Sequence, residues 1–123
     1  MADLFNEISN AINNYFDGLY QSDVSKLSSV FHPDCHLFSS TGGYLNWSRD
    51  EWLEAVSNRN SPEKLSLNRH DRIISIDIAD QNTAFAKVQI AIPPRFFTDY
   101  LSFLRLEGDW QIVSKTFRTE IHK

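Results

Sequence analysis

Four long β-rich runs in the second half of the chain restrict its fold more than any other feature of the sequence. The runs are rich in β-branched and aromatic residues, and short turns containing DQN, PPR and EGD separate them. They are RIISIDIA (72–79), TAFAKVQIAI (83–92), FFTDYLSFLRL (96–106) and WQIVSKTFRTEI (110–121). Strand-forming runs joined by such short turns pair as hairpins. The sequence therefore predicts a mostly antiparallel sheet.

The first half of the chain has the apolar spacing of amphipathic helices. Apolar residues recur at intervals of three and four over residues 3–20, which predicts a helix there. Ser22 or Asp23 can cap a second helix that runs to Val30, and Pro33 prevents the helix from continuing. Two helices are therefore expected before the first strand.

The motif SRDE, residues 48–51, is a capping box and predicts a third helix that carries Trp52. A short strand over residues 35–40 and a TGG turn are expected between the second and third helices. Helices that precede hairpin-linked strands predict an α+β fold, in which the helices cover one face of the sheet.

Composition and charge exclude several classes of protein. The net charge of −4 and the absence of any Lys/Arg run argue against a nucleic-acid-binding surface. No apolar run reaches the ~18 residues that a membrane span needs, and the N-terminus MADLFNEISN has no basic and apolar signal segment. The single cysteine, Cys35, cannot form an internal disulfide. We therefore expect a cytoplasmic protein that contacts neither nucleic acid nor membrane.

The order of these elements is similar to the cone-shaped fold of the nuclear transport factor 2-like (NTF2-like) superfamily. The resemblance is carried by YFDGLYQSDVSKLSSVFHPD, LNWSRDEWLEAV, TAFAKV and FTDYLSFLRLEGDWQIVSKTF. Within the superfamily the chain resembles the SnoaL-like group labelled putative lumazine-binding proteins. The resemblance implies one SnoaL-like domain over residues 1–123, with N-terminal helices on the concave face of a strongly curved, mostly antiparallel sheet. It implies no activity, because this fold is used by enzymes, binding proteins and scaffolds alike.

Ketosteroid isomerase shares the fold, and its catalytic residues can be compared with this chain. An alignment without gaps places its oxyanion-binding tyrosine on Tyr15 and its general-base aspartate on Ser39, and its protonated aspartic acid falls near Ser102. A serine hydroxyl cannot remove a carbon-bound proton at neutral pH or replace a buried acid. The comparison therefore disfavours isomerase chemistry.

The segment VFHPDCHLFSS brings His32, Cys35 and His36 close together in the sequence. Pro33 prevents the two histidines from sharing a helix turn, and in a strand Cys35 and His36 point to opposite faces. The sequence therefore predicts no metal site. His36 alone stays a candidate as a polar or acid–base group that faces the pocket.

The strands 83–92 and 110–121 allow two opposite orientations. In the first orientation, their aliphatic faces form the core and both lysines, Lys87 and Lys115, reach solvent. In the second, which follows the isomerase alignment, the lysines face the concave pocket and the aliphatic face lies outside. The second orientation also places Asp99 outside, since it lies at odd spacing from Ser102.

The resemblance implies a small-molecule pocket between the first helix, the third helix and the concave face of the sheet. With Lys87 and Lys115 inside and no carboxylate beside them, a small polar or anionic aromatic ligand is expected, without a cofactor. The candidate ligand-binding residues are Tyr15, His36, Trp52, Phe85, Lys87, Lys115 and Phe117. Each aromatic residue among them can equally be part of the core.

Two other functions stay open from the sequence. The chain can be a SnoaL-like enzyme of the cyclase, isomerase or dehydratase type, with His36 and Tyr15 as acid–base groups. It can also be a protein-interaction scaffold with a filled pocket. In the second orientation of the strands, a homodimer is expected to cover the outer aliphatic face. That face comprises Ala84, Val88, Ile90, Leu101 and Phe103.

Overall fold

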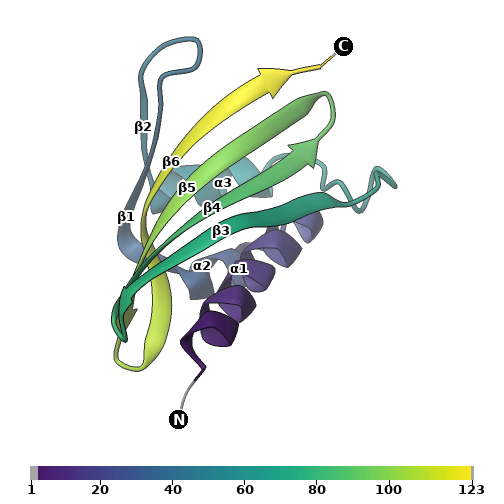
Figure 1. Cartoon of the computed structure of the whole chain (residues 1–123). Coiled ribbons are helices and arrows are strands. Elements are labelled where there is room, and N and C mark those ends of the chain that lie inside the picture. Colours follow the sequence, from purple (N-terminus) through teal and green to yellow (C-terminus); the bar gives the residue numbers. More distant parts are fainter. Residues whose placement is uncertain (1–2, 123) are drawn as a thin grey trace.

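The computed structural model describes residues 3–122, in which three helices lie against one face of a curved six-stranded sheet (Figure 1). The helices are α1 (Leu4–Gln21), α2 (Val24–Val30) and α3 (Arg49–Ser57). The strands are β1 (Phe31–Ser39), β2 (Leu45–Ser48), β3 (His70–Asp80), β4 (Thr83–Ile92), β5 (Arg95–Leu106) and β6 (Asp109–Ile121). The predicted α+β fold is confirmed.

The sheet has the strand order β2-β1-β6-β5-β4-β3. The hairpins β3–β4, β4–β5 and β5–β6 are antiparallel, as is the pair β1–β2, whereas β1 lies parallel to β6. The sheet curves around the helices without closing into a barrel (Figure 1). None of the described helices is long and apolar enough to cross a membrane.

The helix boundaries follow the capping signals of the sequence. Asp23 caps α2, because its side chain accepts a hydrogen bond from the backbone N–H of Lys26. Ser22 instead ends α1 in the left-handed conformation, with φ of 51°. At α3 both hydrogen bonds of the capping box form between Ser48 and Glu51.

One predicted strand needs correction, and one strand was not predicted. β1 begins at Phe31, ahead of Pro33, rather than at Cys35. The register of β1 and β6 shifts between Phe31 and His36, so Pro33 lies in an irregular stretch where its missing N–H removes no ladder bond. β2 was not predicted from the sequence, because it has only four residues and pairs with β1 alone.

The aliphatic face of β4 lies inside the molecule, against the helices. Ala84, Val88, Ile90, Leu101 and Phe103 are all buried in the core. The first orientation of β4 is therefore correct, and the assignment of these five residues to an outer dimer surface is wrong. Phe85 and Lys87 lie on the opposite face of the strand.

A bulge in β6 explains why Lys115 does not follow Lys87. Ser102 of β5 pairs with Ser114, whereas the next residue, Phe103, pairs with Ile112, so Val113 is an extra residue in β6. An extra residue reverses the alternation of side chains beyond it. Ile112 and Lys115 therefore both face the helices, although simple alternation predicts opposite faces.

Candidate functional site

A cavity of about 270 Å³ lies between α1, α3 and the concave face of the sheet. We call it the cone cavity. Its polar floor consists of Tyr15, Asp99 and Lys115, which are all buried. Its aromatic wall consists of Trp47, Trp52, Phe97 and Phe117, and its basic mouth of the exposed residues Arg59 and Arg95.

The floor contains a phenol, a carboxylate and an ammonium group in contact. Tyr15 Oη donates a hydrogen bond of 2.5 Å to Oδ2 of Asp99. Lys115 Nζ lies 3.7 Å from the same oxygen. The side chains of Lys115 and Asp99 are only 7% and 1% exposed. Bulk solvent therefore screens this ion pair weakly.

Three different features of the fold bring the floor together. Tyr15 belongs to the buried stripe of α1, which also carries Ile8 and Ile12. Asp99 shares a face of β5 with the core residue Leu101. Lys115 reaches the same face only because of the bulge at Val113. The floor thus joins α1 to the two central strands of the sheet.

One oxygen of the carboxylate has no partner. Asp99 Oδ1 is buried and makes no hydrogen bond within residues 3–122. A buried carboxylate oxygen without a donor costs free energy, so native structures normally satisfy such atoms with protein, water or a ligand. Asp99 lines the cone cavity. Oδ1 itself has almost no accessible surface, so a bound molecule with an O–H or N–H group can supply the missing donor when the side chains that cover Oδ1 move aside.

Burial sets the protonation behaviour of the floor. The pKa of Tyr15 lies well above its usual value, first because of burial and then because of the negative charge of Asp99. The pKa of Lys115 is lowered by burial, and the charge of Asp99 opposes this shift. Tyr15 thus keeps its proton at neutral pH, and Lys115 releases its proton more readily than an exposed lysine does.

Aromatic rings surround the ammonium group of Lys115. Its Nζ lies 4.8 Å from the ring centroid of Trp52, 5.0 Å from that of Phe117 and 5.2 Å from that of Tyr15. The negative faces of such rings attract a cation. They offset part of the free energy that burial of the charge costs.

The mouth of the cone cavity is positively charged. The pKa of Arg59 is lowered, mainly by desolvation and to a smaller extent by the positive charge of Arg95. Both arginines line the cone cavity, and their positive charges repel each other there. Within residues 3–122, neither Arg59 nor Arg95 forms a salt bridge. The salt bridges of arginines there are made by Arg49, Arg69, Arg105 and Arg118. An anion at the mouth would relieve this repulsion.

The structure places four of the seven sequence-predicted ligand-binding residues in the cone cavity: Tyr15, Trp52, Lys115 and Phe117. His36 instead lies exposed on β1, with Nδ1 2.7 Å from Oδ1 of Asn46. Phe85 and Lys87 are on the far face of the sheet, where Lys87 Nζ lies 5.6 Å from the ring centroid of Tyr100. Two of these placements follow from the orientation of β4.

Asp99 is the residue of the floor that sequence reasoning missed; Trp47, Arg59, Arg95 and Phe97 of the wall and the mouth were missed as well. The alignment with the isomerase put Ser102 inside and hence Asp99 outside, whereas the structure buries Asp99 against Tyr15. Its spacing from Leu101 and Phe103, two core residues at alternate positions, was the available signal. The expectation that no carboxylate lies beside Lys115 is therefore wrong.

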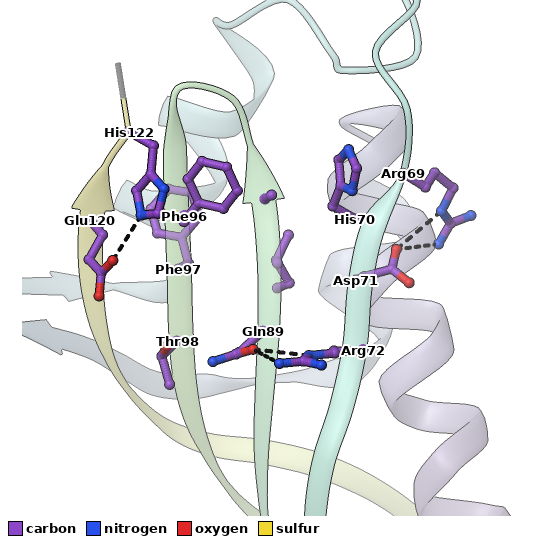
Figure 2. A pocket seen from close by; sticks show the side chains of 12 residues that line it. Arg69, His70, Asp71, Arg72, Gln89, Phe96, Phe97, Thr98, Glu120 and His122 are labelled. Carbon is purple, nitrogen blue, oxygen red and sulfur yellow. Dashed lines mark hydrogen bonds and ion pairs between the residues drawn. The ribbon is translucent and has the colours of Figure 1, made fainter.

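A second cavity of about 520 Å³ lies on the opposite face of the sheet and is shown in Figure 2. We call it the outer cavity. Several of its polar side chains already pair with one another: His122 with Glu120 at 2.9 Å, and Arg72 with Gln89 at 2.9 and 3.0 Å. These residues are exposed or half-buried. The outer cavity therefore offers no buried unpaired group, and the cone cavity is the better candidate site.

No group of three or more potential metal ligands occurs in the part of the chain that the structure describes. The buried thiol of Cys35 has a pKa raised to about 11, chiefly by burial. A thiol with this pKa stays protonated at neutral pH and is a poor nucleophile. The chemistry of the site thus rests on the floor and the mouth of the cone cavity.

Comparisons with known proteins agree on the fold. A family model described as putative lumazine-binding matches residues 3–118. Aldolase FrzH from Cladobotryum sp is 25% identical over 107 residues, which cover 85% of this chain and 82% of that protein.

Among solved structures, an NTF2-like protein of unknown function from Silicibacter pomeroyi superposes with a TM-score of 0.85 at 22% identity, over 94% of this chain and 95% of that one. One from Methylobacillus flagellatus has a TM-score of 0.82 at 27% identity, over 98% and 94%. A protein called a putative scytalone dehydratase, from Novosphingobium aromaticivorans, has a TM-score of 0.71 at 18% identity, over 98% and 89%.

Proposed function

The chain belongs to the putative lumazine-binding family of the NTF2-like superfamily, a ligand-binding domain of this fold, and we propose that its cone cavity binds one small, flat, anionic molecule. The observation that carries this proposal is the unpaired Oδ1 of Asp99 beneath an aromatic wall. The ligand would present a hydrogen-bond donor to the floor and its anionic group to the mouth.

The wall favours a flat ligand. Trp47, Trp52, Phe97 and Phe117 line the cone cavity together. Aromatic side chains bind planar rings through offset stacking and edge contacts, and they exclude water from the polar groups beside them. A volume of about 270 Å³ fits one small aromatic molecule rather than an extended chain.

The two ends of the cavity favour different polar groups. At the floor, the charge of Lys115 is already balanced by Asp99. An anion is therefore not needed there, while Oδ1 of Asp99 needs a donor. At the mouth, Arg59 and Arg95 attract an anion. We thus still propose the anionic ligand expected from the sequence, but its anionic group would bind the two arginines rather than Lys87 and Lys115.

Calorimetric titration with three small aromatic compounds tests the proposal. 4-Hydroxybenzoate has both a donor and an anion, benzoate has only the anion, and 4-hydroxybenzamide replaces the carboxylate by a neutral amide. We expect 4-hydroxybenzoate to bind at least about tenfold more tightly than either of the others, which corresponds to one lost polar contact of about 1.4 kcal/mol. Equal affinities for all three would contradict the proposal.

A variant at the mouth tests the contact of the anionic group. Arg95→Gln should weaken both carboxylates and leave 4-hydroxybenzamide unchanged. Lys87→Gln removes a positive charge from the far face of the sheet and is the matched control, since Lys87 lies next to Tyr100 and outside the cone cavity. The control should bind all three compounds as the unmodified protein does.

A second candidate function is an enzyme that moves a proton next to a carbonyl group. Its support is the phenol–carboxylate–ammonium floor, together with the similarity to a protein named an aldolase. In this role Asp99 is the base, whereas the sequence suggested His36, which lies outside the cone cavity. Loss of an α-deuterium from a small ketone, abolished by Asp99→Asn, would support it. Deuterium loss that is no faster with the protein than in buffer alone would contradict the enzyme function.

The scaffold alternative requires a filled pocket. The cone cavity keeps about 270 Å³ of open volume. We therefore prefer the two functions that use this space.

A further inference from the structure

We propose that Lys115 is a covalent anchor, whose Nζ condenses with an aldehyde or ketone group of a molecule in the cone cavity to form an imine. This inference rests on the proposed function, because it uses the same cavity. It adds a chemical class, carbonyl compounds, and a reactive residue.

Lys115 lies where a carbonyl compound in the cone cavity can reach it. Among the residues that line the cone cavity, Lys115 is the one that carries a primary amine. Its Nζ belongs to the polar floor, 4.8 Å from the ring centroid of Trp52 and 5.0 Å from that of Phe117. A planar carbonyl compound that stacks on this wall brings its carbonyl carbon toward the amine.

The contact between Lys115 and Asp99 leaves the ammonium group able to react. At 3.7 Å, the Nζ–Oδ2 distance is longer than a hydrogen bond, so the ammonium group is attracted to the carboxylate without being fixed by it. Oδ2 is already occupied by the hydroxyl of Tyr15. Oδ1 is free to accept a proton.

Each step of the condensation has a group in place. Asp99 takes a proton from the ammonium group, the amine nitrogen attacks the carbonyl carbon, and Asp99 returns this proton to the carbonyl oxygen. Asp99 then takes a second proton from the nitrogen of the adduct and gives it to the new hydroxyl group. This group leaves as water when the nitrogen lone pair forms the C=N bond, and Asp99 is a carboxylate again. In sum, an ammonium group and a carbonyl compound give a protonated imine and one water molecule. No oxidant or reductant is needed.

The charge balance of the buried floor is kept throughout. The protonated imine carries the same single positive charge as the ammonium group it replaces, at the same place beside Asp99. The product therefore avoids the cost of an unpaired buried carboxylate. Burial also lowers the pKa of Lys115, which increases the share of free amine at neutral pH.

The other described lysines lack this environment. Lys26 donates a hydrogen bond of 2.8 Å to Gln21, Lys64 is exposed, and Lys87 lies on the far face of the sheet. They serve as internal controls, because reductive alkylation without a binding site modifies lysines according to their exposure. A buried lysine that reacts first would need a cavity that concentrates the carbonyl compound around it.

4-Formylbenzoate is the probe that fits both ends of the cavity, with an aldehyde for Lys115 and a carboxylate for the mouth. The protein is treated with this probe and sodium cyanoborohydride, which reduces an imine to a stable amine, and the modified lysine is identified by peptide mass spectrometry. We expect Lys115 to be labelled at least about tenfold faster than Lys87 or Lys64, and 4-hydroxybenzoate to slow only the labelling of Lys115.

Lys115→Arg is the matched variant, because it keeps a positive charge beside Asp99 but has no primary amine. Its circular dichroism and melting temperature show whether it folds. A folded Lys115→Arg protein should lose the fast adduct and keep the slow ones. Labelling of the unmodified protein in the order of exposure, with Lys115 last, would overturn the inference.

The two proposals can fail separately. If 4-hydroxybenzoate binds with the expected preference and Lys115 is not labelled, the imine is refuted and the binding function stands. If Lys115 is labelled rapidly but 4-hydroxybenzoate neither binds nor competes, the proposed anionic ligand is wrong and the reactive lysine stands.

Discussion

Tyr15 of α1 and Asp99 of β5, which are 84 positions apart in the sequence, are joined by a buried hydrogen bond of 2.5 Å between the phenol and the carboxylate. The same carboxylate oxygen faces the ammonium group of Lys115 at 3.7 Å. One cluster thus contributes both to the packing of the helix on the sheet and to the chemistry of the cone cavity. Substitutions there should change stability and binding together.

Removal of one charge of the buried pair should be more harmful than removal of both. Lys115→Met leaves the Asp99 carboxylate buried without its counter-charge, which costs about 3–5 kcal/mol of unfolding free energy. In Lys115→Met/Asp99→Asn, the amide is neutral and its oxygen can still accept the hydrogen bond from Tyr15. We therefore expect the double variant to regain most of the lost stability in urea denaturation. A double variant less stable than Lys115→Met would contradict the ion pair.

The hydroxyl of Tyr15 should make stability depend on alkaline pH. Its folded-state pKa is raised above the usual 10.0. Its contribution to stability is therefore complete below pH 10.0 and is lost as the pH rises through the folded-state pKa, because the folded protein then binds more protons than the unfolded chain.

The difference in unfolding free energy between the unmodified protein and Tyr15→Phe isolates this effect from Cys35 and Lys115, which also have shifted pKa values. It should be constant from pH 7 to 9 and should decrease above about pH 10. A difference that increases above pH 10 would contradict a buried, protonated tyrosine.

Gly18 should not tolerate a side chain. A Cβ at this position of α1 would lie 2.7 Å from Cδ2 and 2.8 Å from Cγ of Leu27, which is fully buried in α2. Gly18→Ala should therefore lower the unfolding free energy by about 1–3 kcal/mol through overpacking, although alanine favours helices. The exposed position Asn14 of the same helix is the control, and Asn14→Ala should be neutral or slightly stabilising. Equal effects at both positions would show that α1 and α2 pack less closely.

The homodimer stays a prediction, on a different surface from the one first assigned. Phe85, Tyr100 and Leu104 are exposed to 41%, 38% and 36% on the outer face of the sheet. We expect a second copy of the chain to cover them, because the patch is apolar and a two-fold axis would match it with itself.

Light scattering at micromolar concentration should give twice the mass of one chain, and Phe85→Lys should give monomers that still bind 4-hydroxybenzoate. A monomer in the unmodified protein would refute the homodimer.

Local signals in the sequence predicted most of the fold. The Ser48–Glu51 capping box and the cap at Asp23 gave helix starts that the structure confirms, since such motifs satisfy their own backbone groups without distant contacts. The four long runs became β3 to β6. β2 was missed because a four-residue strand has too little pattern of its own.

The candidate site was predicted less well, because it depends on the register of distant strands. The alternation of side chains between the two faces of β6 breaks at Val113. This extra residue is defined only by the pairing of β6 with β5, so no periodicity in the sequence marks it. In β4 both faces carry apolar residues, so pattern alone could not choose between them. Lys115 was placed inside by an alignment that also placed Lys87 inside, and only the first placement agrees with the structure.

A crystal structure of the protein with 4-hydroxybenzoate shows directly whether the cone cavity binds a small anionic aromatic molecule. We expect the ring in the cone cavity against Trp52 and Phe117, with the hydroxyl group donating to Oδ1 of Asp99 and the carboxylate at Arg59 and Arg95. A ligand bound only in the outer cavity of Figure 2, between Arg72 and His122, with the cone cavity holding water alone, would contradict it.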